Sequence, residues 1–135
     1  MSKLSPEIEA RLWAAAEDAA AQAYAPYSGF FVGAALLTSE GEIVTGCNVE
    51  NASYGLTSCA ERTAVFRAIV EGKLSKGISI AAIAVVNRDH QGCSPCGACR
   101  QVLSEFGLHA VVLYEKDGER KRTTVSALLP ESFQL

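Results

Sequence analysis

Residues 78–86 form a near-continuous apolar run, ISIAAIAVV, and this run constrains the fold more than any other feature of the chain. A strand with one face in water alternates apolar and polar residues, whereas a strand buried on both faces reads as an unbroken apolar stretch. A helix-like segment from about residue 96 to 106 and a strand-like segment at 110–114 follow it. The order strand, helix, strand predicts a right-handed parallel crossover from a buried strand.

The flanking segments add further strands and helices. Ser5 and Pro6 are typical of a helix start, because a hydroxyl caps the first turn and proline suits the first helical position. The prediction is an α/β fold with three α-β-α layers and a mixed sheet of about five strands, in one domain of residues 1–135. The other expected elements are a helix over 6–23, a hairpin of strands 31–38 and 42–47, a helix from 58 to 72, a strand at 123–125 and a helical turn at 126–129.

Composition excludes several classes of function. The net charge is −3, from 12 basic and 15 acidic residues without a basic block, so nucleic-acid binding is not expected. Five cysteines is an odd number, and no signal-like apolar segment comes first, so we expect a cytoplasmic protein whose thiols bind metal or do chemistry. The apolar runs are too short to span a bilayer, which predicts a soluble protein with no membrane partner.

Two short segments carry the chemistry, and each stands where a helix is expected to begin. Cys59 lies in Ser-Cys-Ala-Glu, and Cys96 and Cys99 lie in Pro-Cys-Gly-Ala-Cys. Residues three apart on a helix share a face, so the second pair can bind one tetrahedral ion. With Cys59 the ligands number three, and three protein ligands with one open position are typical of catalytic zinc. The pattern predicts one Zn²⁺ per subunit with a water in the open position.

The residues that follow Cys59 suggest how such a site would work. Glu61 stands two residues from a ligand, where its carboxylate can take a proton from the water and return it to the substrate. Three thiolates leave the metal with a net negative charge, so the charge needs an offset. The N-termini of the two helices supply part of it. We predict that Arg62 supplies the rest by donating a hydrogen bond to a ligating sulfur.

With these segments in place, the sequence resembles the cytidine deaminase family, in its short homotetrameric branch, over nearly the whole chain. The resemblance also rests on the stretches PYSGF, which ends at Phe30, and GCNVEN, which contains Asn48 and Glu50. It implies zinc-dependent hydrolysis of cytidine and 2′-deoxycytidine to uridine and 2′-deoxyuridine, with release of ammonia, as in pyrimidine salvage. The substrate would then be a small free nucleoside.

The resemblance also implies roles for individual substrate-binding residues. The ring of Phe30 would pack on the pyrimidine, Asn48 and Glu50 would hold the ribose hydroxyls, and the backbone of Ala60 would meet the base. Asn48 and Glu50 would share a face in an extended segment and leave no room for a bulky 3′-phosphate. By the same resemblance, Tyr54 and Phe133 would reach a neighbour's pocket, so that the subunits of a homotetramer share their sites.

Several simpler interpretations stay open. Ser58 and Glu61 have the spacing of a capping box, and Cys96 with Cys99 alone is also compatible with a redox pair. A fourth ligand from Cys47 or Cys93 would make the zinc site structural and the protein non-enzymatic.

Two other interpretations concern the cofactor and the substrate. The spacing from Cys93 to Cys99 overlaps an iron–sulfur run, but Leu103 stands where that run needs a cysteine. A deaminase of another aminopyrimidine, such as blasticidin S, is the nearest alternative enzyme.

Overall fold

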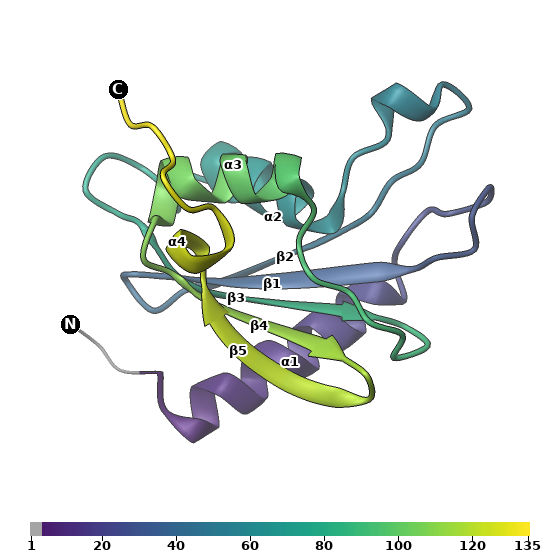
Figure 1. Ribbon diagram of the computed structural model, residues 1–135, viewed down its shortest axis with the longest axis horizontal. Coiled ribbons are helices and arrows are strands. Elements are labelled where there is room, and N and C mark those ends of the chain that lie inside the picture. The colour runs from purple at the N-terminus through teal and green to yellow at the C-terminus, as the bar shows by residue number, and fades with distance from the viewer. Residues whose placement is uncertain (1–3) are drawn as a thin grey trace.

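The computed structural model describes residues 4–135 as a mixed five-stranded sheet covered by helices on both faces (Figure 1). The strand order is β2-β1-β3-β4-β5. The elements are α1 (Pro6–Ala20), β1 (Val32–Thr38), β2 (Ile43–Cys47), the 3-10 helix η1 (Tyr54–Leu56), α2 (Ala60–Val70), β3 (Ile80–Asn87), α3 (Gly97–Gly107), β4 (Val111–Lys116), β5 (Glu119–Thr124) and α4 (Val125–Leu128).

The three-layer prediction is confirmed. Helix α1 covers one face of the sheet, and α2, α3 and α4 cover the other (Figure 1). Alternate residues of one strand serve the two layers: Ile83 belongs to the core under α2 and α3, and Ala84 to the core under α1. Both are fully buried, as the apolar run at 78–86 predicts for a strand covered on both sides.

The pairing of β3 with β4 decides where the chemistry lies. These two strands are parallel, joined through α3, while every other neighbouring pair in the sheet is antiparallel. The predicted crossover is therefore present. It places the start of α3 beyond the carboxyl end of β3, next to the start of α2. The two motif segments therefore meet at the same end of the sheet (Figure 1).

Gly46 allows α2 to lie directly on β2. A Cβ atom at this position would stand 2.3 Å from the backbone nitrogen of Ala64 and 2.7 Å from the carbonyl oxygen of Ala60. Only glycine permits a helix backbone to come this close to a strand. The contact fixes the first turn of α2, and therefore the height of Cys59 and Glu61 above the sheet.

Some element bounds differ from the expected ones. Strand β5 begins at Glu119 and not at 123, because a tight turn through Asp117 and Gly118, both at positive φ, returns the chain at once. Its first residues are charged and exposed, which suits an edge strand. They show no apolar alternation by which the sequence could indicate a strand. Helix α1 ends at Ala20, before the expected 23. Within residues 4–135, no helix has the length and apolar character needed to cross a membrane.

Candidate metal centre

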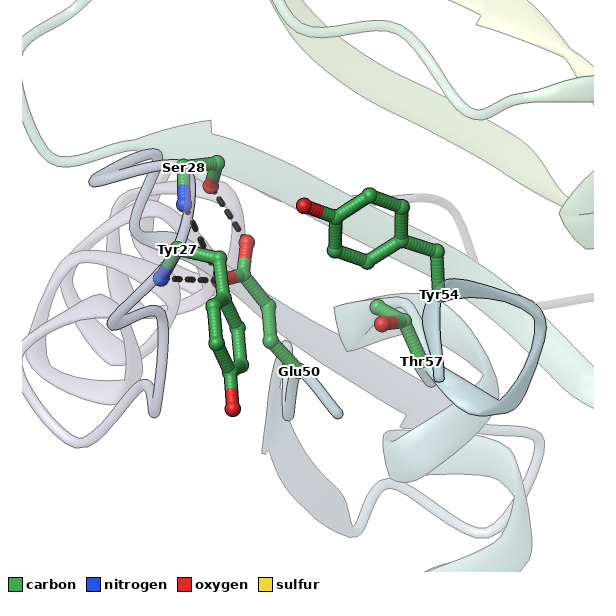
Figure 2. A pocket seen from close by; sticks show the side chains of 5 residues that line it. All are labelled: Tyr27, Ser28, Glu50, Tyr54 and Thr57. Atoms are coloured by element: carbon green, nitrogen blue, oxygen red, sulfur yellow. Dashed lines mark hydrogen bonds between the residues drawn. The ribbon is translucent and has the colours of Figure 1, made fainter. Parts of the chain in front are cut away.

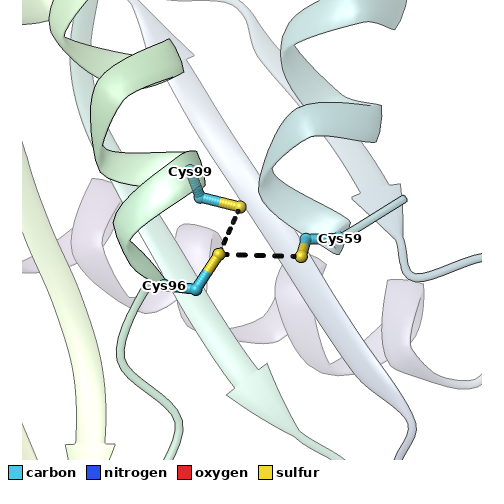
Figure 3. A group of neighbouring side chains, drawn as sticks. All are labelled: Cys59, Cys96 and Cys99. Atoms are coloured by element: carbon cyan, nitrogen blue, oxygen red, sulfur yellow. Dashed lines mark hydrogen bonds between the residues drawn. The ribbon is translucent and has the colours of Figure 1, made fainter. Parts of the chain in front are cut away.

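Three cysteine sulfurs converge where α2 and α3 begin (Figure 3). Cys59 caps α2, Cys96 caps α3, and Cys99 lies in the first turn of α3. The Sγ atoms of Cys59 and Cys96 are 3.9 Å apart, and those of Cys96 and Cys99 are 3.5 Å apart. Sulfurs bound at about 2.3 Å to one tetrahedral zinc ion lie about 3.8 Å from each other. The donor set and its spacing therefore fit zinc.

The surroundings of the sulfurs favour thiolates. Both helices direct their N-terminal ends, and so a partial positive charge, at the group. The pKa of Cys59 is lowered to about 5, first by a hydrogen bond with Cys99 and, against the effect of burial, by a further bond from Arg62. Arg62 Nη2 lies 3.3 Å from Cys59 Sγ, which is the contact that was predicted for it. In the metal-free protein the pKa of Cys99 is raised, because Cys99 shares a hydrogen bond with Cys59 and is buried.

Glu61 is a buried carboxyl group next to the sulfurs. Only 4% of the Glu61 surface is exposed. Burial raises the pKa of Glu61 to about 7, and the negative charge of Cys59 adds to the effect, while a hydrogen bond from its own backbone N–H opposes it. A carboxyl group with a pKa near neutrality can take up and release a proton in one reaction cycle. The helix is capped by Cys59 and not by Ser58, so Glu61 stands one position too early for a capping box.

The other two cysteines lie apart from the group. Among the residues that the structure describes, only Cys59, Cys96 and Cys99 form a set of three or more candidate ligands within 4.8 Å of one another. Cys47 is the last residue of β2, and burial raises the pKa of its thiol. Burial raises the pKa of Cys93 to about 12, with a smaller contribution from the charge of Glu61. Neither thiol therefore belongs to the group of sulfurs that can share one ion.

A cavity of about 370 Å³ is lined by the polar and aromatic side chains of Tyr27, Ser28, Glu50, Tyr54 and Thr57 (Figure 2). One Glu50 carboxylate oxygen accepts hydrogen bonds from the backbone N–H groups of Tyr27, at 2.9 Å, and Ser28, at 3.1 Å. The Ser28 hydroxyl also donates to Glu50, and this bond is the main reason why the pKa of Glu50 is lowered. Glu50 is thus held as a carboxylate at the cavity wall.

Sequence reasoning missed the turn that holds Glu50. Tyr27 and Ser28 entered the sequence analysis only within the stretch PYSGF, with no role of their own. The turn does carry a local signal, since Ser28 accepts a hydrogen bond from the N–H of Phe30 two residues on, as serine often does in turns. Its partner Glu50, however, is 22 residues away from Ser28 along the chain.

The motifs and the three-cysteine geometry point to one family. The family described as "cytidine and deoxycytidylate deaminase zinc-binding region" matches residues 6–115. This chain belongs to that family. The family's zinc-binding character and the three-cysteine group together identify zinc as the cofactor of this deaminase family member. The fold and the family that the sequence predicted are confirmed.

Individual members of the deaminase family are similar over most of the chain. The cytidine deaminase of Sporosarcina psychrophila is 49% identical over 125 residues, which are 91% of this chain and 89% of that protein. The crystal structure of cytidine deaminase from Burkholderia pseudomallei has a TM-score of 0.83 and 49% sequence identity, and covers 92% of this chain and 98% of its own. A blasticidin-S deaminase from Bacillus cereus is 33% identical over 106 residues, 76% of each chain.

Three further residues predicted for the deaminase site, Asn48, Phe30 and Ala60, are buried or partly buried. Asn48 is 8% exposed, and its amide joins β2 to the start of β1: Oδ1 accepts from the Val32 N–H at 2.8 Å, and Nδ2 donates to the Phe30 carbonyl at 2.7 Å. Phe30 is partly buried against the core. Ala60, between Cys59 and Glu61, is buried.

Two of the predicted site residues are exposed to solvent in a single chain. Tyr54 is 77% exposed and Phe133 is 68% exposed. The Tyr54 ring meets that of Tyr27 edge to face, with centroids 6.2 Å apart. Figure 2 shows Tyr54 directed across the cavity towards Ser28 and Glu50.

Proposed function

We propose that this protein hydrolyses cytidine and 2′-deoxycytidine to uridine and 2′-deoxyuridine, with release of ammonia, as a step of pyrimidine salvage. The observation that carries the proposal is the group of three cysteines at two helix starts beside Glu61, whose pKa is raised to about 7. A general acid and base must have a pKa near the working pH, and the catalytic form of zinc leaves one position open. The relatives that match most of the chain are named cytidine deaminases.

Cys59, Cys96 and Cys99 hold the zinc in this proposal. When bound, zinc lowers the pKa of the attacking water. Glu61 takes a proton from that water and delivers it to N3 of the cytosine ring while the oxygen attacks C4. Glu61 then transfers the second water proton to the departing amine, so that ammonia leaves and the carboxylate is restored. Arg62 holds Cys59 and offsets part of the charge of the three thiolates.

The nucleoside is bound between the metal centre and the cavity beside Glu50. Asn48 and Glu50 bind the ribose hydroxyls, and each keeps hydrogen-bonding capacity beyond the bonds described above. Phe30 packs on the base, and the backbone of Ala60 contacts its edge. Because Asn48 also holds Phe30 by its carbonyl, the sugar and base contacts depend on one amide.

The assembly in this proposal is a homotetramer in which Tyr54 and Phe133 complete neighbouring pockets. Both are large apolar side chains that a single chain leaves exposed. The outer face of α2 is also apolar: Phe66 is 50%, Ile69 41% and Val70 87% exposed. Exposed apolar surface of this kind is typical of a subunit contact. We place the protein in the cytoplasm, where its five thiols stay reduced, as a single domain of residues 1–135.

The direct test is to add cytidine to purified protein and follow the ultraviolet change that accompanies its conversion to uridine, with and without a zinc chelator. We expect turnover that stops on chelation and returns with zinc. Glu61→Gln is the matched control, because it keeps the shape of the side chain and the three sulfurs; it should bind zinc and lose at least about 10²–10⁴-fold in kcat. Turnover of blasticidin S without turnover of cytidine would assign the site to another aminopyrimidine.

A further inference from the structure

Of the three sulfurs, that of Cys96 is the least protected by its surroundings. Cys99 is fully buried, and Cys59 receives a hydrogen bond from Arg62. Cys96 is exposed and caps α3 without a side-chain hydrogen bond to the helix. It also follows a loop, so its position depends on how that loop is fastened.

Arg100 fastens this loop from the first turn of α3. Its Nε donates to the carbonyl of Pro95, immediately before Cys96, at 2.7 Å. Its Nη1 donates to the carbonyl of Leu128 at 3.1 Å. The preceding bond that ties the loop to the sheet runs from the N–H of Cys93 to the carbonyl of Glu115. Arg100 therefore holds the peptide that leads into the ligand.

Packing fixes the position of Leu128, so its carbonyl can anchor the loop. It is the last residue of α4, and its side chain packs against the main core. Val125, at the start of α4, is buried, and its N–H donates to the carbonyl of Ala110 at 3.0 Å. The carbonyls at a helix C-terminus lack partners within the helix, so an arginine is well suited to bind one of them.

We propose that Arg100 is a positioning residue for the metal centre: it fixes Cys96 by bonding Pro95 on one side and the end of α4 on the other. The proposal rests on the zinc site of the proposed function. A guanidinium group is planar and presents donors in fixed directions, so it can serve two carbonyls at once. A lysine ammonium is a point charge on a flexible stem and does not reproduce this geometry.

The test is the zinc affinity of the folded protein, measured by competition with a chromogenic chelator. We expect Arg100→Gln to weaken zinc binding by about 10–100-fold, the usual effect of losing a group that orients a ligand. Arg67→Gln is the matched control, since Arg67 also donates to a carbonyl, that of Thr45 in β2 at 3.3 Å, but from a position about two turns along α2 from Cys59. It should leave zinc affinity within about twofold of the natural chain. Arg100→Lys should recover only part of the loss.

Two further measurements distinguish a positioning role of Arg100 from a general loss of protein stability. The thermal midpoint of each metal-free variant is measured, and zinc affinity is compared at a temperature where all are folded. The Co²⁺-substituted proteins report the thiolate geometry, and we expect an altered thiolate-to-cobalt absorption band in Arg100→Gln, a smaller change in Arg100→Lys and none in Arg67→Gln. If Arg100→Gln does not fold, Arg100→Lys carries the same comparison. Natural-chain affinity in the folded Arg100 variants overturns the positioning role, whereas a natural chain that binds no zinc overturns the proposed function.

Discussion

Replacing Glu61 by glutamine should stabilise the metal-free protein at high pH relative to the natural chain, by an amount that grows between about pH 4 and pH 8. Burial raises the pKa of Glu61 from 4.5 to about 7. The folded chain therefore holds this proton more tightly than the unfolded chain does. The stability that the protonated carboxyl contributes is fully present below 4.5 and is lost as the pH rises through about 7.

The size of the effect follows from the two pKa values. The interval from 4.5 to about 7 corresponds to about 3 kcal/mol in the free energy of unfolding, at about 1.4 kcal/mol per pKa unit. Glutamine has the same shape and does not titrate. Cys59, whose pKa is lowered to about 5, acts with the opposite sign, losing its stabilising effect as the pH falls through that value, but it is present in both proteins. Its contribution cancels in their difference, except for the part that depends on repulsion between the Cys59 thiolate and the Glu61 carboxylate.

The assay is urea unfolding in chelator and reductant at several pH values, followed by the fluorescence of Trp13, which is buried and is the one tryptophan of the chain. Glu50→Gln is the control, because the pKa of Glu50 is lowered and Glu50 stabilises the fold only above its own titration range, below 4.5. Its stability difference should therefore change only below about pH 4.5 and stay nearly constant from there to pH 8. A Glu61→Gln difference that stays constant from about pH 4 to pH 8 would refute the burial argument.

Four further substitutions test separate parts of the structure. Cys47→Ser and Cys93→Ser should each retain zinc, counted by atomic emission, since neither thiol belongs to the three-sulfur group; loss of zinc in either would favour a structural site. Gly46→Ala should lower the free energy of unfolding by at least about 2 kcal/mol, because its Cβ would press on the backbone of α2. Asn48→Ala should lower it by about 1–3 kcal/mol, since the buried N–H of Val32 loses its acceptor, and should raise KM for cytidine. Unchanged urea midpoints would contradict the last two.

The sequence was sufficient for the fold where burial alone determines the pattern. The run at 78–86 predicted a strand covered on both faces, and β3 is buried at nearly every position. β5 was predicted too short, because residues 119–122 are charged and exposed, and an edge strand with a solvated surface carries no apolar alternation. Its pairing depends on the turn at Gly118 and on β4, not on its own composition.

The three-cysteine group was predictable because Cys96 and Cys99 lie three residues apart and because all three cysteines stand at helix starts. Apart from Arg62, which lies three residues from Cys59, the groups that hold the site in place were not predictable, since they depend on contacts between distant segments. Asn48 was predicted to bind ribose, but its bonds to Val32 and Phe30 arise only once β2 has paired with β1. Arg100 reaches a carbonyl 28 residues away, and a backbone acceptor leaves no trace in the amino-acid sequence.

X-ray absorption at the zinc edge of the purified protein tests the central claim most directly. The claim is that Cys59, Cys96 and Cys99 bind one zinc ion and leave one position for water beside Glu61. The spectrum should fit three sulfur atoms at about 2.3 Å and one oxygen at about 2.0–2.1 Å. Four sulfur atoms, or a folded protein that takes up no zinc, would contradict it.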